Sequence, residues 1–193
     1  MRLFTYIVAH DRGFAPNPFW GYCTLATCKP KIRNVAQKGD WIVGLSPKAL
    51  GNKLVYAMKV EEKLTHDQYF NDPRFAAKKP EPESPDSKRK CGDNMYYRAK
   101  CNGLYEQSKS AIHGAEDFKR DTSSEYVLIS AKDDFYYCGK DAKELPSGIL
   151  QKIVVGRGHI SNFEQSTIKE VIEFISRLPK GINGEPRDII KRQ

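Results

Sequence analysis

The chain has 193 residues, and its 32 Lys and Arg against 24 Asp and Glu give a formal net charge of +8. That length predicts one compact domain with an apolar core of its own. No run approaches the roughly 20 apolar residues of a membrane span, and the first residues lack the long apolar centre of a secretory signal. Five cysteines, an odd number, are typical of reduced thiols rather than of a disulfide framework. We therefore expect a cytoplasmic protein with no membrane partner.

Most of the positive charge lies in the first third of the chain. Residues 1–60 hold nine Lys or Arg against two acidic residues, Asp11 and Asp40, which leaves +7. The same segment is rich in aromatic residues. Cations attract phosphate in any sequence, and aromatic rings stack on bases, so this composition is compatible with nucleic-acid binding. The alternative is a solvated basic surface over a core that holds the aromatic residues.

The first half of the chain predicts strands rich in β-branched and aromatic residues, over 3–9, 41–45 and 54–64. Residues 13–31 contain Gly and Pro but are too apolar for an ordinary surface loop, so we expect a folded loop that lines something. Residues 32–37 predict one or two helical turns. Thr65 is the expected N-cap of a short helix.

The second half opens with residues 76–93, a predicted exposed loop with many charges and three prolines. Further along, we expect a hairpin or irregular turns within 94–107, a hairpin over 125–139 that turns at 132–134, and a strand over 149–156. Residues 161–178 are typical of an amphipathic helix, with a capping-box pattern at Ser161 and Glu164. After Pro179 the polar tail, 180–193, is expected to be loosely held, so we place one domain over 1–179.

Several motifs are absent from the sequence. It has no G-x-x-x-x-G-K-[ST] loop, no Rossmann glycine pattern, no H-E-x-x-H and no repeated C-x₂-C pair. We therefore expect no metal and no cofactor. An enzyme stays open as an alternative, because folding can bring Cys23 near His10 or His159, although nothing local marks an activated thiol.

The segment from His10 to Trp20 is the first candidate site. It places ionisable, amide and aromatic groups between prolines and glycines, which restrict the backbone and reduce the entropy lost on binding. Asn17 offers a donor and an acceptor to a base edge, and an aromatic ring can stack on the base. The alternative is a structural loop whose rings close one end of the fold. The candidate residues are His10, Asp11, Phe14, Asn17, Phe19 and Trp20.

The second candidate is the Gly156–Arg157–Gly158–His159 turn. We expect a strand to enter it and a capped helix to follow, so backbone N–H groups converge there. Arg157 and His159 add donors for a phosphate or a base edge. A lone G-x-G is also common in ordinary strand–helix turns.

Taken in order, the segments HDRGFAPNPFWGYCTLATCKPKIR, GDWIVGL, LVYAMKVEEKLTHDQYFNDPRF, GDNMYY and VVGRGH resemble the nucleotide modification associated domain of the second type. The resemblance covers about residues 3–163. It implies a PUA-like or EVE-like fold, a superfamily whose members bind RNA or modified bases, in bacterial DNA-modification or defence settings. It also adds Asp93 and Asn94, from the GDN segment, as further edge readers.

We therefore predict an α+β fold, with a PUA-like, EVE-like curved mixed sheet or small β-barrel, flanking helices and a C-terminal amphipathic helix. The expected function is a binding module for a modified base in nucleic acid or for a free modified nucleotide. Two alternatives stay open: a hydrolase or transferase that acts on modified nucleotides, and a protein-interaction module. The sequence does not decide the oligomeric state.

Overall fold

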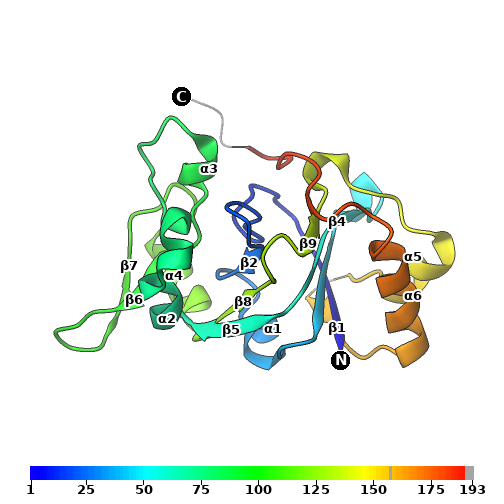
Figure 1. Cartoon of the computed structure of the whole chain (residues 1–193), viewed down its shortest axis with the longest axis horizontal. Coiled ribbons are helices and arrows are strands. Elements are labelled where there is room, and N and C mark those ends of the chain that lie inside the picture. The colour runs from blue at the N-terminus through cyan, green and yellow to red at the C-terminus, as the bar shows by residue number, and fades with distance from the viewer. Residues whose placement is uncertain (157, 190–193) are drawn as a thin grey trace.

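The computed structural model describes residues 1–156 and 158–189, and a six-stranded mixed sheet lies at its centre (Figure 1). The strands are β1 (Leu3–Ile7), β3 (Trp41–Leu45), β4 (Leu54–Lys59), β9 (Phe135–Tyr137), β10 (His159–Ile160) and β11 (Gly181–Ile182). Their order is β10-β1-β3-β4-β9-β11. The β1/β3 and β9/β11 pairs are parallel, and the other neighbours are antiparallel.

Successive side chains of a strand point to opposite faces of a sheet. In this sheet the side chains on both faces are apolar. One face packs against α5 (Ser147–Ile153) and α6 (Gln165–Ile175), through residues that include Leu3, Val43, Ile153, Ile168 and Val171. The opposite face packs against α1 (Pro30–Val35) and a second sheet, through residues that include Phe4, Met58, Ile32 and Leu128. The central sheet is therefore buried between two layers.

The second sheet is small and antiparallel. It consists of β2 (Thr24–Leu25), β8 (Tyr126–Ile129) and β5 (Glu62–Thr65), in the order β2-β8-β5. At the left of Figure 1 lie α2 (His66–Asn71), α3 (Ser87–Lys90), α4 (Ala115–Asp121) and the hairpin of β6 (Tyr96–Arg98) with β7 (Tyr105–Gln107). Three 3-10 turns complete the described elements: η1 (Lys48–Leu50), η2 (Pro73–Lys78) and η3 (Gly139–Asp141).

Several expectations from the sequence are confirmed. The fold is α+β with a multi-stranded mixed sheet, and the hairpin within 94–107 is present as β6 and β7. Thr65 caps α2: its hydroxyl accepts from the amide of Gln68 at 3.2 Å, while Gln68 Oε1 accepts from the amide of Thr65 at 2.8 Å. The helix near the C-terminus is amphipathic, with its predicted apolar stripe buried on the sheet.

Of the two expected forms, a curved mixed sheet or a small β-barrel, the described residues form a mixed sheet and not a closed barrel. Among the described residues, β10 and β11 are the two edges of an open central sheet and do not pair with each other. Closure would require these two edge strands to pair. Residues 54–64 also form two strands rather than one, because the chain turns at Val60 and Glu61 and enters the second sheet as β5.

Two further predictions are corrected. Residues 125–139 do not form a hairpin, since β8 pairs with β2 and β5 whereas β9 pairs with β4 and β11; only the Ala131–Asp134 bridge closes the turn. Residues 147–153 are helix α5 and not a strand, because Ile149, Leu150 and Ile153 lie on one helical face against the sheet.

The ends of the C-terminal helix and of the chain also differ from expectation. Helix α6 begins after Glu164 without a side-chain cap, so the expected capping box is absent. The described part of the tail, up to residue 189, packs against the rest of the fold. Its Gly181–Ile182 segment pairs with β9, and Asp188 exchanges hydrogen bonds with Asp11, in which each amide donates to the other residue at 2.7 and 2.9 Å.

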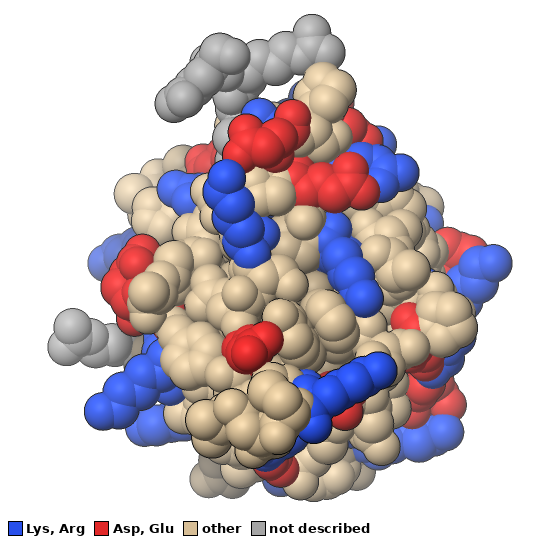
Figure 2. All heavy atoms as spheres, turned by 90° about the vertical axis from the view of Figure 1, so that its left-hand side faces the viewer, with Lys and Arg blue, Asp and Glu red and all other residues tan. Residues whose placement is uncertain are grey.

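The ends of the charged loop over 76–93 are buried, including Lys78 and Cys91. Figure 2 shows the side of the molecule that carries this loop, and positive and negative side chains alternate there around a broad uncharged region. On the described part of that face the charges do not form a continuous basic patch. Among the described residues, no helix reaches the length and apolar content that crossing a membrane requires.

Candidate functional site

Two adjoining cavities meet at Cys28, Lys29 and Arg120, which line both of them. The first cavity, of about 260 Å³, is lined further by residues that include Tyr6, His10, Arg12, Phe14 and His113. The second cavity, of about 410 Å³, is lined further by residues that include Lys31, Ile32 and His159. We call the two together the groove. Its size lies within the range of sites for small ligands, roughly 300–1,000 Å³.

The groove lies where the end of β1 meets two segments distant in sequence. The last residue of β1, Ile7, and residues 8–15 that follow it form one wall of the first cavity. The turn at Cys28 and Lys29, just before α1, forms the floor between the two cavities. The opposite wall is formed by His113, which lies just before α4, and by Arg120 of α4. Segments about 90 residues apart thus build one site.

The turn before α1 is strained. Cys28 and Lys29 have φ angles of 55° and 41°, in the left-handed region that non-glycine residues rarely adopt. Three hydrogen bonds hold it: the Cys28 amide donates to Asp121 Oδ1 at 2.9 Å, the Cys28 carbonyl accepts from Arg33 Nε at 2.8 Å, and the Lys29 carbonyl accepts from the Arg33 amide at 3.1 Å. Strain of this kind concentrates at functional sites.

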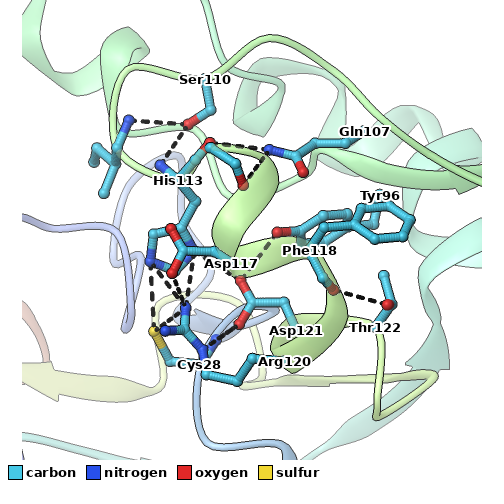
Figure 3. A network of polar contacts seen from close by, with 12 residues as sticks. Cys28, Tyr96, Gln107, Ser110, His113, Asp117, Phe118, Arg120, Asp121 and Thr122 are labelled. Atoms are coloured by element: carbon cyan, nitrogen blue, oxygen red, sulfur yellow. Dashed lines mark hydrogen bonds and ion pairs between the residues drawn. The ribbon is translucent and has the colours of Figure 1, made fainter.

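Cys28, His113 and Asp121 form a continuous chain of polar contacts (Figure 3). The Cys28 Sγ lies 3.7 Å from His113 Nε2, and His113 Nδ1 lies 2.7 Å from Asp121 Oδ2. Asp121 is fully buried and also accepts from the hydroxyl of Tyr96 at 3.0 Å. Arg120 closes the network, with Nε 3.0 Å from Asp121 Oδ1 and Nη2 3.9 Å from the sulfur.

The electrostatics of this network favour a charged imidazole. Burial by itself lowers the pKa of His113. The hydrogen bonds to Asp121 and Cys28, and the charges of these two residues, have the larger opposite effect and raise the pKa of His113 to about 9. For Asp121, burial raises the pKa, while His113, Arg120 and the Cys28 amide oppose it and bring it to about 2. At neutral pH, His113 is therefore an imidazolium bound to a carboxylate.

The same three residues offer sulfur, nitrogen and oxygen atoms within 4.8 Å of one another, a spacing at which a metal ion can be held. Arg120 speaks against that interpretation. Its Nη2 lies 3.4 and 3.5 Å from the two ring nitrogens of His113, and its Nε pairs with Asp121. A guanidinium thus occupies the space beside the ligands, and a protonated ring has no lone pair for a metal.

Three cations of the groove have no carboxylate partner among the described residues: Arg12, Lys29 and Lys31. Lys29 lies over the ring of Tyr6, with Nζ 4.6 Å from the ring centroid, and burial lowers its pKa. Burial, and then the charges of Lys31 and Lys29, lower the pKa of His159. The groove therefore carries a positive potential suited to an anion.

Of the residues that the sequence singles out, His10, Phe14 and His159 line the groove. Phe14 is buried and meets the ring of His113 edge-on, with 4.6 Å between centroids. Asp11 is buried too, but it accepts a hydrogen bond from the hydroxyl of Tyr137 at 2.6 Å, and burial raises its pKa. Because Asp11 also exchanges hydrogen bonds with Asp188, it belongs to the contact with the C-terminal tail.

The amide and acidic candidates lie in buried networks away from the groove. Asn17 Oδ1 accepts from Lys78 Nζ at 2.7 Å, and its Nδ2 donates to the Cys91 carbonyl at 2.8 Å. Asp93 accepts from the hydroxyls of Thr24 and Tyr69, and Asn94 donates to the carbonyls of Tyr69 and Phe75. All three are at most 1% exposed, and protein groups take the hydrogen bonds of their side-chain atoms except Asn94 Oδ1, which has no partner among the described residues.

The aromatic pair of the first candidate segment also lies outside the groove. Phe19 is buried and meets the half-buried Trp20 edge-on, with 5.6 Å between ring centroids. Phe19 lines a separate cavity of about 60 Å³, together with Lys88 and Pro186. Arg157, the remaining candidate, lies outside the described residues.

Sequence reasoning missed Cys28, His113 and Asp121. Of the cysteines, it favoured Cys23, which is fully buried and whose pKa burial raises far above its usual range. Cys28 is half-buried and faces the groove. Its one local signal is the Cys-Lys-Pro sequence that precedes a helix, and this signal does not identify a partner 85 residues away.

Comparison with known proteins identifies the family. The family model described as nucleotide modification associated domain 2 matches residues 1–193, and the chain therefore belongs to this family. No curated protein and no solved structure matches the chain. The family description links the protein to nucleotide modification and assigns no residue a role.

Proposed function

We propose that the protein recognises a nucleotide with a modified base, either free or within a nucleic acid strand, and binds it in the groove. The observation that carries this proposal is the lining of the groove. Arg12, Lys29 and Lys31 face it without carboxylate partners among the described residues, next to the protonated His113. Such a set of charged donors suits the several oxygens of a phosphate.

The apolar part of the lining suits a base. Tyr6, Val8, Phe14 and Ile112 contribute to the first cavity beside the cations. A nucleotide offers both features, a charged phosphate and a flat ring, to neighbouring parts of one site. The preference for a modified base rests on the family to which the chain belongs. A PUA-like or EVE-like ancestry is part of the same proposal, and a solved structure of a family member would test it.

Isothermal titration calorimetry with dCMP, 5-methyl-dCMP, dAMP and N6-methyl-dAMP tests the proposal. We expect at least one base-modified monophosphate to bind more tightly than its unmodified parent. The matching nucleoside without phosphate should bind about tenfold more weakly or worse, since a charge-assisted hydrogen bond contributes about 1.5–3 kcal/mol. Short single strands that carry the same bases distinguish a free nucleotide from a strand.

Arg12→Gln and Lys31→Gln should each weaken binding of the monophosphate about tenfold. The matched control is Lys169→Gln, because Lys169 lies exposed on α6 across the central sheet from the groove. Equal affinity of all three variants and the unaltered protein would place the site elsewhere. Failure of every monophosphate and every strand to bind would refute the proposal.

A further inference from the structure

The contacts of Cys28 reproduce the order of groups that activates a nucleophile. A thiol lies next to an imidazole, at 3.7 Å from Nε2, and a buried carboxylate orients that imidazole from the other side, at 2.7 Å from Nδ1. Nucleophile, base and orienting acid in this sequence define the triads of cysteine hydrolases and acyltransferases on unrelated folds. The S···N separation is slightly long, as is usual before a substrate binds.

Cys28 differs from the other four cysteines. Cys23, Cys91 and Cys138 are buried, and burial raises the pKa of each thiol. Cys101 is exposed on the hairpin loop between β6 and β7. Cys28 alone combines access to a cavity with contacts to His113 and Arg120, two groups that carry positive charge.

The position of the sulfur within the groove suggests the kind of bond that it attacks. Cys28 lines both cavities, at the floor between them, so a substrate that fills both places its connecting bond near the sulfur. Arg120 Nη2, which pairs with Asp117 Oδ1 at 2.8 Å and lies 3.9 Å from the sulfur, has a second N–H for an oxyanion that forms there. A carbonyl that links two groups meets both requirements.

We propose that Cys28 is the nucleophile, His113 the acid and base, and Asp121 the orienting group of a hydrolytic site for nucleotides acylated on the exocyclic amine of the base. This inference rests on the proposed nucleotide site and adds an activity to it. The nucleotide occupies one cavity and the acyl group extends into the other, with the amide bond over Cys28.

The reaction proceeds in two steps that balance without a redox partner. The Cys28 thiolate adds to the amide carbon, forming a C–S bond; the C–N bond then breaks, and the departing amine of the base takes the proton of His113 Nε2. Water next adds to the thioester carbon and gives a proton to His113. The C–S bond breaks, the carboxylic acid leaves as its anion after losing its proton to water, and the thiolate–imidazolium pair is restored.

Reactivity of the thiols tests the nucleophile without reference to any nucleotide. The full chain is treated with a limiting amount of iodoacetamide at pH 7, and modification of each cysteine is followed by peptide mass spectrometry. We expect Cys28 to react at least tenfold faster than Cys101, the exposed reference. His113→Asn should remove this advantage, since it keeps a donor near Asp121 and deletes Nε2. Equal rates at Cys28 and Cys101 would overturn the proposal.

Turnover tests the substrate class. N4-acetyl-dCMP is the probe, and release of dCMP and acetate is the readout. Cys28→Ser should abolish release, His113→Asn should lower its rate about 100-fold or more, and Cys101→Ser should leave it unchanged. A protein adduct with the mass of one acetyl group, removed by hydroxylamine and absent from Cys28→Ser, would identify the thioester.

Two results separate failure of this inference from failure of the nucleotide site. If N4-acetyl-dCMP binds by calorimetry but is not cleaved and forms no adduct, the nucleotide site stands and the catalytic proposal falls. If stoichiometric Zn²⁺ binds and protects Cys28 from iodoacetamide, and His113→Asn abolishes Zn²⁺ binding, the triad is a metal site and the catalytic proposal is again overturned.

Discussion

The Nε of Arg33 donates to the carbonyl oxygen of Cys28 at 2.8 Å, so a fully buried cation holds the strained turn that carries the groove thiol. The same guanidinium donates to the carbonyls of Asp121 at 2.6 Å and Tyr126 at 2.7 Å. Burial lowers the pKa of Arg33 to about 10, opposed by the charge of Asp121, and the group stays protonated at neutral pH. Arg33 thus ties α1 to the end of α4 and to β8.

Replacing this cation should be costly. Arg33→Met leaves several buried carbonyl groups without their donor, and we expect the free energy of unfolding to fall by about 3 kcal/mol. Urea denaturation followed by circular dichroism measures this change. Arg74→Met is the matched control, since Arg74 pairs with Glu62 and Asp72 at the surface and should contribute less than about 1 kcal/mol. Similar losses in the two variants would contradict this role for Arg33.

His66 should make the protein sensitive to acid. Its Nε2 lies 3.1 Å from Arg33 Nη1, so the ring accepts a hydrogen bond and is neutral. Burial, and then the charge of Arg33, lower its pKa from 6.5 to about 3, with Asp121 opposing. The unfolded chain then binds a proton between these two values that the folded protein does not. The free energy of unfolding that His66 contributes is complete above pH 6.5 and is lost as the pH falls towards 3.

Denaturation midpoints measured at intervals from pH 7 to pH 4 test this dependence. His66→Gln keeps an acceptor for Arg33 but does not titrate, so its stability should change less with pH than that of the unaltered protein. An unchanged slope in His66→Gln would assign the acid sensitivity to other groups.

Asn17 should matter for stability and not for base preference. Its Oδ1 is 2.7 Å from Nζ of Lys78, whose pKa burial lowers to about 8 while the charges of Asp93 and Cys23 raise it. Asn17→Leu removes that acceptor, and we expect a loss of about 2–3 kcal/mol in thermal or urea denaturation. The exposed Asn34→Ala should cost less than about 0.5 kcal/mol. A stable Asn17→Leu protein with altered base preference would show that Asn17 reads the base.

Salt dependence should report how many groove cations contact phosphates of a strand. If Arg12, Lys29, Lys31 and Arg120 all do so, the logarithm of the affinity for oligo(dT) should fall with the logarithm of the salt concentration with a slope of about −3. Lys31→Gln should reduce this slope by about 0.7. Fluorescence anisotropy at 50–200 mM salt measures it. A slope near zero would restrict the ligand to a free nucleotide.

Local pattern predicts those parts of the fold that local interactions determine. The cap at Thr65, the apolar stripe of α6 and the strand character of residues 3–7 each follow from residues a few positions apart. Pairing between distant segments decides the rest. Residues 54–64 do not show that the chain changes sheets at Val60. A strand that leaves the core at its charged end has the same pattern as a buried strand followed by the half-buried strand β5.

The site illustrates the same limit more sharply. A polar residue in a loop suggests a ligand only if no protein group takes its hydrogen bonds, and the partners of Asn17 lie 61 and 74 residues further along. Conversely, Cys28 and His113 have no distinguishing neighbours in the sequence, yet folding places them 3.7 Å apart. Two properties of the site follow from the sequence. The cations of the first 60 residues supply Arg12, Lys29 and Lys31 to the groove, and both candidate segments contribute to its lining.

The contact between Asp11 and Asp188 has a consequence for how the protein is made. The Asp11 amide donates to a carboxylate 177 residues further along, and Arg187 donates to the carbonyl of Ala9, which lines the first cavity. Because synthesis proceeds from the N-terminus, this wall of the cavity stays open until residues 187 and 188 have left the ribosome. The strands on which the groove rests can therefore pair well before the groove itself is complete. Nascent chains that already hold β1, α1 and β3 should not yet capture a nucleotide.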